Sequence, residues 1–176
     1  MAYALRHNPS RYGLEPDRHG FVELAPFVSI ATRRYAELTE ERLRQLVKGP
    51  LAQRFEIVED RLRARYGHSI PVEPVGEPIE PPELLYHGTA SDRTAALFSE
   101  GLKPMDRRML HLSETIEDAL SVARRKTDQP AVLRVLARQA HVRGIAFYRE
   151  GRVYLVKEIP SEFLALESVP ELQQPQ

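Results

Sequence analysis

The feature that most constrains this chain is a proline-rich segment near its middle. Residues 71–82 read PVEPVGEPIEPP and contain five prolines. Proline removes a backbone donor and breaks regular helices, and within sheets it is confined to edges and bulges. We therefore expect a stiff linker at 71–82 between an N-terminal lobe, 1–70, and a C-terminal lobe, 83–170. Residues 171–176 are polar and predict a frayed tail.

The N-terminal lobe shows helix signals followed by a hairpin signal. Thr39 is a suitable N-cap for a helix with apolar Leu43, Leu46 and Val47 on one face, and Gly49-Pro50 ends it. Alternating apolar residues on both sides of Glu59-Asp60 predict a β-hairpin over 55–66. Helices followed by a β-hairpin favour a winged-helix-like lobe.

The C-terminal lobe alternates short apolar strands with two helices. We expect strands at 84–86, 110–113, 132–136 and 153–156, and helices around 95–98 and 116–123. This pattern predicts the α+β class, with a mixed α/β C-terminal lobe built from short strands. His87-Gly88-Thr89 directly follow the first strand. Glycine there would let a ligand approach the backbone, although an ordinary turn is the alternative.

Composition limits the chemistry. Basic and acidic residues balance, with 12 of each up to Pro82 and 13 of each beyond it, so RNA binding would need a few placed cations. The sequence has no cysteine, which excludes thiolate nucleophiles and disulfides, and no close His/Asp/Glu spacing suggests a metal site. No apolar run resembles a signal peptide or approaches ~18 residues, so we expect a cytoplasmic protein without membrane contact.

Several blocks occur together in an order that resembles the RNA 2′-phosphotransferases, the family that removes the 2′-phosphate left at a tRNA splice junction. The resemblance runs from about residue 4 to residue 164. It departs from the family after Tyr148, where a shorter turn lacks the usual Asn-Gly. The blocks are LRHNP (5–9), GLEPDRHGFV (13–22), LRARYGHS (62–69), YHGT (86–89), GLKPMDRRMLHLSET (101–115), VARRKTDQPAVLRV (122–135) and GIAFY (144–148).

The resemblance implies an NAD-dependent RNA 2′-phosphotransferase with an ADP-ribosyltransferase-like NAD-binding lobe. The RNA 2′-phosphate would attack the anomeric carbon of the nicotinamide riboside and release nicotinamide. The ribose 2″-hydroxyl of the resulting ADP-ribosylated RNA would then attack the phosphate. The products would be 2′-hydroxyl RNA and ADP-ribose 1″,2″-cyclic phosphate. The implied partners are NAD as co-substrate, no metal, and a 2′-phosphorylated RNA such as tRNA, and we expect a monomer.

The resemblance also implies site residues. Arginine forks suit a phosphate dianion because they are always charged and bind its oxygens bidentately. The family's Arg-His-Arg-Arg set maps onto Arg6, His7, Arg63 and Arg125, with Arg124 as the competitor for the fourth place. The implied NAD contacts are His87, Gly88, Thr89, Arg107, His111 and Ser113. Taken singly, each arginine could equally be a solvated surface charge, and His111 a buried structural histidine.

Two other functions stay open on the sequence. An ADP-ribosyltransferase that caps terminal phosphates of RNA or DNA would share the first chemical step and omit the second. A non-catalytic nucleotide- or RNA-binding module would keep the fold without turnover. Product analysis separates the first alternative, and NAD consumption separates the second.

Overall fold

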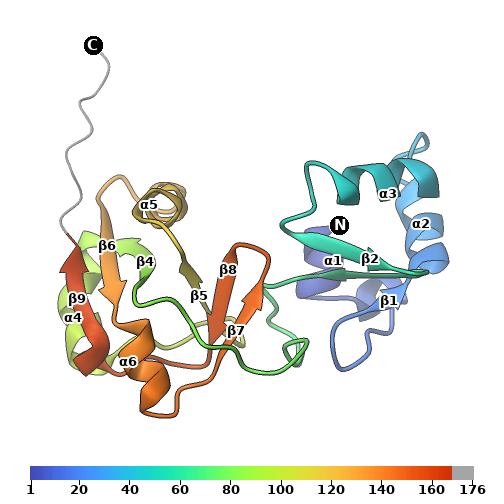
Figure 1. Ribbon diagram of the computed structural model, residues 1–176. Helices are drawn as coiled ribbons and strands as arrows, with labels where there is room; N and C mark the ends of the chain where they lie inside the picture. The colour runs from blue at the N-terminus through green and yellow to red at the C-terminus, as the bar shows by residue number, and fades with distance from the viewer. Residues whose placement is uncertain (168–176) are drawn as a thin grey trace. The chain divides into compact units, whose positions relative to one another are not determined.

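The structure, a computed structural model, describes residues 1–167 and consists of two compact units (Figure 1). The first contains Met1–Glu77 and Met105–Met109, and the second contains Pro78–Pro104 and the chain from Leu110 onward. The predicted tail, 171–176, and the end of the predicted 83–170 lobe lie outside the described residues. The short segment Met105–Met109 differs from expectation, since we placed it in the C-terminal lobe. It belongs to the first unit, where the Arg108 backbone N–H donates to the His68 carbonyl oxygen at 3.0 Å.

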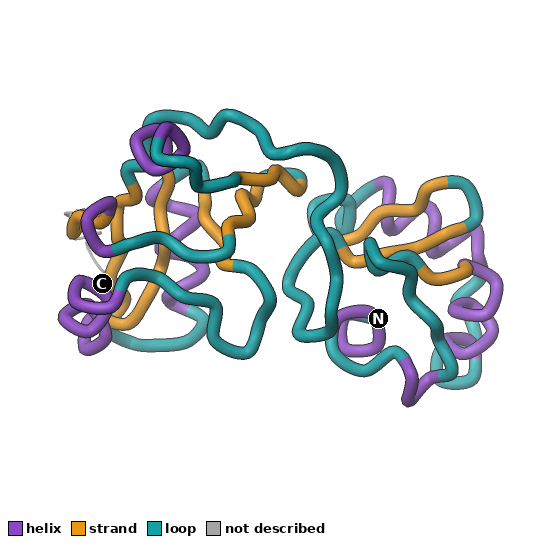
Figure 2. Tube along the Cα trace, turned by 90° about the horizontal axis from the view of Figure 1, so that it is seen from below, coloured by secondary structure: helices purple, strands orange, loops and turns teal. Residues whose placement is uncertain are grey.

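The first unit combines helices with a three-stranded antiparallel sheet of strand order β1-β3-β2. Helix α1 packs against β3, and α3 packs against β2. Figure 2 shows helices beside the strands in each unit. Its buried core is apolar and includes Leu5, Leu24, Phe27, Leu43, Val47, Phe55 and Leu62. The elements are α1 (Ala2–Arg6), the 3-10 turn η1 (Ser10–Tyr12), β1 (Val22–Glu23), α2 (Leu24–Thr32), α3 (Glu40–Lys48), β2 (Phe55–Val58) and β3 (Arg61–Ala64).

Local signals fix two of these elements. The Thr39 hydroxyl accepts a hydrogen bond from the Arg42 backbone N–H at 3.1 Å, so the predicted N-cap of α3 is confirmed. The predicted hairpin is confirmed as β2–β3, and Glu59 takes a positive φ of 53° in its turn. Helix α2 was not predicted. Its proline, Pro26, lies in the first turn, where a helix needs no backbone donor.

The second unit is built on a six-stranded antiparallel sheet of order β7-β8-β5-β4-β6-β9. Helix α5 covers part of the sheet through Ala119, Leu120 and Val132. A larger core contains Leu85, Leu112, Leu133, Phe147 and Val156. The elements are β4 (Leu85–Ala90), η2 (Ser91–Arg93), α4 (Thr94–Glu100), β5 (Leu110–Ser113), α5 (Ile116–Arg124), β6 (Pro130–Val135), α6 (Ala137–Val142), β7 (Phe147–Glu150), β8 (Val153–Val156), η3 (Ser161–Phe163) and β9 (Leu164–Glu167).

The arrangement agrees with the α+β class that the sequence predicted. Three helices rather than two accompany the strands of the second unit, since α6 was not predicted. Strands β7 and β9 were also missed. The winged-helix and ADP-ribosyltransferase-like descriptions of the two lobes stay predictions.

The strand that carries His87-Gly88-Thr89 is longer than predicted. We expected it to end at Tyr86, but β4 continues to Ala90 because these residues pair with Pro130–Leu133 of β6. On its other side β4 pairs with β5 only through Tyr86 and Ser113. From His87 onward, therefore, β5 forms no ladder with β4. The predicted NAD contacts of the second unit lie on β4 and on the neighbouring strand β5.

Candidate functional site

Arg6, the last residue of α1, is a buried cation. Its side chain is only 9% exposed, and its guanidinium lies 5.4 Å from the Phe55 ring centre and 5.2 Å from that of Tyr66. The buried Nε and Nη2 atoms have no hydrogen-bond partner within residues 1–167, and no carboxylate there forms an ion pair with Arg6. A buried polar group without a partner is costly, so this guanidinium is suited to receive an anion.

The segment Tyr66–Ser69 supports Arg6 and its neighbour His7. The Ser69 backbone N–H donates to the Arg6 carbonyl oxygen at 3.0 Å, and the Ser69 hydroxyl shares a 3.0 Å hydrogen bond with His7 Nδ1. Gly67 has a φ of +89°, and a Cβ there would lie 3.4 Å from the Arg6 side chain. His7 itself is exposed. The segment thus fixes a buried arginine and a solvent-accessible histidine next to each other.

Arg63 lies on β3 and is more deeply buried, at 3% exposure. Its cross-strand neighbour Glu56 accepts a hydrogen bond from Nε and forms an ion pair with Nη2. The guanidinium also lies 5.1 Å from the Phe21 ring centre. The interpretation of Arg63 as part of a wet hairpin face is therefore wrong, because both faces of β3 are covered at this point.

The first unit gathers further positive charge around Arg6. Burial, and then repulsion from Arg54, lowers the pKa of Arg6 to about 10, and Arg107 adds to the repulsion. Burial also lowers the pKa of His68 to about 4, with further contributions from Arg6, Arg63 and His7. A neutral His68 at physiological pH keeps this cluster from carrying one more charge. Arg107, which was predicted to face the NAD phosphates, thus lies near Arg6, a predicted phosphate ligand of the first unit.

The fourth predicted phosphate residue belongs to the second unit. Arg124 is the last residue of α5 and Arg125 is its C-cap, and both side chains are exposed. Neither burial nor hydrogen bonding distinguishes them. The choice of Arg125 over Arg124 stays a prediction.

The predicted NAD contacts of the second unit lie on β4 and β5. His87 Nδ1 donates to the His111 carbonyl oxygen at 3.2 Å, which fixes the ring where the two strands stop pairing. Ser113 lies opposite Tyr86, and Thr89 lies further along β4. These residues therefore share one end of the β4–β5 junction.

Gly88 allows close packing of α5 against β4, because a side chain at this position would occupy the space that α5 fills. A Cβ there would lie 2.0 Å from the Ala119 carbonyl oxygen and 3.1 Å from the Ala123 side chain. Helix α5 occupies that space, so the glycine allows the helix backbone to lie against β4. The predicted contact of Gly88 with NAD stays a prediction, and it would be made by the backbone of this residue.

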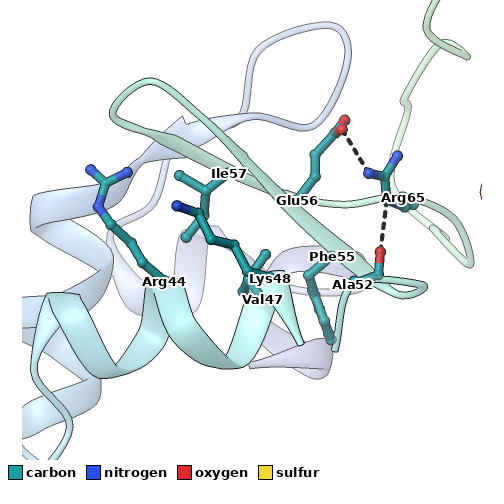
Figure 3. A pocket seen from close by; sticks show the side chains of 8 residues that line it. All are labelled: Arg44, Val47, Lys48, Ala52, Phe55, Glu56, Ile57 and Arg65. Atoms are coloured by element: carbon teal, nitrogen blue, oxygen red, sulfur yellow. Dashed lines mark hydrogen bonds and ion pairs between the residues drawn. The ribbon is translucent and has the colours of Figure 1, made fainter. Parts of the chain in front are cut away.

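A separate pocket opens between α3 and the hairpin of the first unit (Figure 3). Its volume is about 280 Å³, and none of the predicted site residues lines it. Two of its three cations are engaged. Arg44 contacts Glu40 and Asp60, and Arg65 contacts Glu56 and the Ala52 carbonyl oxygen. The pocket adjoins the cationic cluster through Phe55, whose ring Arg6 contacts, and through Glu56, the partner of Arg63. Its lining residues are Arg44, Val47, Lys48, Ala52, Phe55, Glu56, Ile57 and Arg65.

Within residues 1–167, no three His, Asp or Glu side chains come together in a way that could hold a metal ion. Across the same residues, none of the helices has the length and apolar character needed to cross a bilayer.

Comparison with known proteins identifies the family. A sequence model described as "RNA 2'-phosphotransferase, Tpt1 / KptA family" matches residues 1–158. The chain belongs to this family. A "Probable RNA 2'-phosphotransferase" of Thermococcus kodakarensis is 40% identical over 167 residues, covering 94% of this chain and 93% of its own.

Two further relatives of the same printed name support the assignment. The Pyrococcus furiosus protein is 40% identical over 166 residues, covering 94% of this chain and 91% of its own. The Acetivibrio thermocellus protein is 38% identical over 170 residues, covering 95% and 93%. The resemblance to the RNA 2′-phosphotransferases that the sequence blocks suggested is thus confirmed across nearly the whole chain.

The sequence did not point to two residues that lie near the predicted phosphate ligands of the first unit. The first is His68, whose buried Nε2 has no hydrogen-bond partner in the described chain and whose pKa responds to three predicted site residues. Arg54 was not singled out, although its charge is the first electrostatic contribution to the pKa of Arg6 after burial. No local sequence pattern marks Arg54, because its approach to Arg6 depends on the tertiary fold.

Proposed function

We propose that this chain is an NAD-dependent RNA 2′-phosphotransferase that moves an internal RNA 2′-phosphate, as at a tRNA splice junction, onto NAD. The products would be 2′-hydroxyl RNA, nicotinamide and ADP-ribose 1″,2″-cyclic phosphate. Membership of the RNA 2′-phosphotransferase family supports the phosphate transfer. The single structural observation that carries the proposal is the buried, unpaired guanidinium of Arg6 within a cluster of cations.

The cluster suits a phosphate dianion on three grounds. Arg6 lacks acceptors for two of its nitrogen donors, and a phosphate oxygen would supply them. Arg63 already has a carboxylate partner in Glu56. It therefore adds less net positive charge to the cluster, but its guanidinium is held in a fixed orientation. His7 is exposed and held by Ser69, so it can exchange a proton with a bound phosphate or with solvent. The cluster would thus offer a dianion one arginine without a carboxylate partner, Arg6, and one with such a partner, Arg63.

The residues of the second unit fit the NAD side of the proposal. NAD would supply the riboside carbon that accepts the phosphate. Within the described residues β4 pairs with β5 through Tyr86 and Ser113, and we propose that the backbone groups of Gly88, two residues further along, bind the carboxamide. The hydrogen bond from His87 to the His111 carbonyl oxygen holds the imidazole in one orientation. We propose that His87, Thr89 and Ser113 orient the nicotinamide riboside.

The chemistry then follows in two steps. In the first, a 2′-phosphate oxygen forms a bond to the anomeric carbon while the bond to nicotinamide breaks. Positioning matters more there than a strong base, because the transition state resembles an oxocarbenium ion. In the second, the ribose 2″-hydroxyl attacks phosphorus and the RNA 2′-oxygen leaves with a proton. Arginine stabilises the charge on the phosphate, and His7 is placed to move the proton. Arg125 is our proposed fourth phosphate ligand.

The test uses two RNAs of the same sequence, one with an internal 2′-phosphate and one with only a terminal phosphate. Each is incubated with the protein and NAD, and nicotinamide release and RNA mobility are followed. We expect nicotinamide release with the internal phosphate only, and an RNA that loses one phosphate. ADP-ribosylated RNA ends would instead indicate a capping enzyme. Absence of nicotinamide release with both RNAs would indicate a binding module.

A further inference from the structure

Arg54 is a second uncompensated cation next to Arg6. It immediately precedes β2, its side chain is exposed, and its guanidinium lies 5.7 Å from the Phe55 ring centre. Arg6 lies 5.4 Å from the centre of the same ring. The two guanidinium carbons are therefore at most about 11 Å apart. Within residues 1–167 the Arg54 side chain has neither an ion pair nor a hydrogen bond that would neutralise it.

Like charges that approach each other around one aromatic ring are unfavourable unless an anion joins them. Repulsion from Arg54 lowers the pKa of Arg6, so the two charges do interact. Some arginines of the unit are paired with carboxylates, for example Arg44 with Glu40 and Asp60, and Arg61 with Asp17. Within the described residues, Arg6 and Arg54 therefore share one aromatic ring and repel each other, with no carboxylate partner to offset the repulsion.

The chemistry of the proposed substrate supplies two neighbouring anions. An internal 2′-phosphorylated nucleotide carries a 2′-phosphate and a 3′-phosphodiester on adjacent ribose carbons, so the two phosphorus atoms are only a few ångström apart. The buried Arg6 suits the dianion, because it offers donors that need acceptors. The exposed Arg54 suits the monoanionic phosphodiester, which stays linked to the rest of the RNA and must remain near solvent.

We propose that Arg54 binds the 3′-phosphodiester next to the 2′-phosphate, and that it thereby selects internal over terminal 2′-phosphates. This inference rests on the proposed function, since it assumes that the 2′-phosphate lies at Arg6. A terminal nucleotide with a 2′-phosphate and a free 3′-hydroxyl lacks the group that Arg54 contacts.

The test measures RNA binding without NAD, using wild type, Arg54→Gln and the matched control Arg42→Gln. Glutamine keeps part of the side-chain stem over Phe55 but removes the charge. Arg42 is also an exposed arginine of the first unit, and its guanidinium contacts only Gln45, at 3.4 Å. The two ligands are an RNA with an internal 2′-phosphate and the same RNA ending in a 2′-phosphate with a free 3′-hydroxyl. Thermal melting of each variant reports on the fold.

We expect Arg54→Gln to weaken binding of the internal 2′-phosphate RNA by about three- to tenfold, the range of an exposed charge-assisted contact. Its salt dependence should become shallower by about 0.7 in the slope of log K against log salt, as for one lost phosphate contact on a single strand. Binding of the terminal 2′-phosphate RNA should stay as in wild type. Arg42→Gln should change neither, and all three proteins should melt at the same temperature.

Three results would overturn the inference. Equal weakening on both RNAs would mean that Arg54 contacts another phosphate. Unchanged binding by Arg54→Gln would mean that Arg54 is only solvated, and wild-type turnover with NAD would then leave the proposed function intact. Failure of the wild type to bind or turn over either RNA would refute the proposed function and this inference together.

Discussion

Replacing Arg6 by methionine should stabilise the fold while it removes the phosphate site. Burial and repulsion lower the pKa of Arg6 to about 10, so the folded state disfavours the charged form at every pH below that value. A lowering of this size costs about 3 kcal/mol at neutral pH. The contacts with the Phe55 and Tyr66 rings offset about 1 kcal/mol each. Methionine keeps an unbranched apolar chain at the site, so we expect a net gain of about 1 kcal/mol.

The assay is urea unfolding at neutral pH, with and without inorganic phosphate. Phosphate that binds only the folded wild type should raise its free energy of unfolding, by about 2.7 kcal/mol at one hundred times its Kd. Arg6→Met should show a much smaller response. Turnover of 2′-phosphorylated RNA should fall by about two to three orders of magnitude, as for loss of a preorganised donor. The variant would thus exchange activity for stability.

Arg42→Met serves as the matched control, because Arg42 is exposed and has no carboxylate partner in the described chain. It should leave the unfolding free energy within about 0.5 kcal/mol of wild type and keep the phosphate response. Two outcomes for Arg6→Met would refute the reasoning. One is destabilisation by more than about 2 kcal/mol, which would mean that the guanidinium is satisfied in the fold. The other is a phosphate response equal to that of the wild type.

Three further predictions follow from the two units. His87→Ala should weaken NAD binding, whereas Arg63→Ala should leave NAD binding near normal and abolish turnover, and calorimetric NAD titrations with the opposite pattern would reverse the assignment. The pKa of His68 is lowered from 6.5 to about 4, so the neutral ring is favoured in the folded state. The unfolding free energy should therefore fall by up to about 3 kcal/mol as the pH drops from 6.5 to 4. His68→Asn should flatten this part of the profile, and an unchanged profile would contradict it. Gly88→Ala should destabilise by about 1–3 kcal/mol or more, because its Cβ would collide with the Ala119 carbonyl oxygen, and a neutral effect on melting would show that α5 can move away.

The elements that sequence predicted well are those with local causes. Thr39 caps α3 through its own hydroxyl, and the turn at Glu59-Asp60 joins strands whose apolar residues alternate. Each of these signals lies within a few residues of the structure that it produces. The family blocks added Arg6, His7 and Arg63, and the structure gathers these three residues in one unit, where each of them acts on the pKa of His68.

The structural features that the sequence did not predict depend on contacts between residues that are far apart in the chain. β4 extends to Ala90 because β6, some forty residues later, pairs with it. The period-two pattern of the hairpin shows which residues share a face, but not that Arg63 is covered on that face as Leu62 is on the other. The approach of Arg54 and Arg107 to Arg6 likewise requires the tertiary fold. Localisation in the cytoplasm and a monomeric state stay predictions from composition and resemblance.

The central claim is that the 2′-phosphate moves to NAD, and following the phosphorus atom tests it most directly. An RNA carrying a ³²P label in an internal 2′-phosphate is incubated with the protein, NAD and excess chelator. We predict that the label leaves the RNA only when NAD is present, and that one nicotinamide is released for each label transferred. The label should appear in a product with the mass of ADP-ribose cyclic phosphate. Release of the label as inorganic phosphate, transfer without NAD, or a strict requirement for a divalent ion would contradict the account.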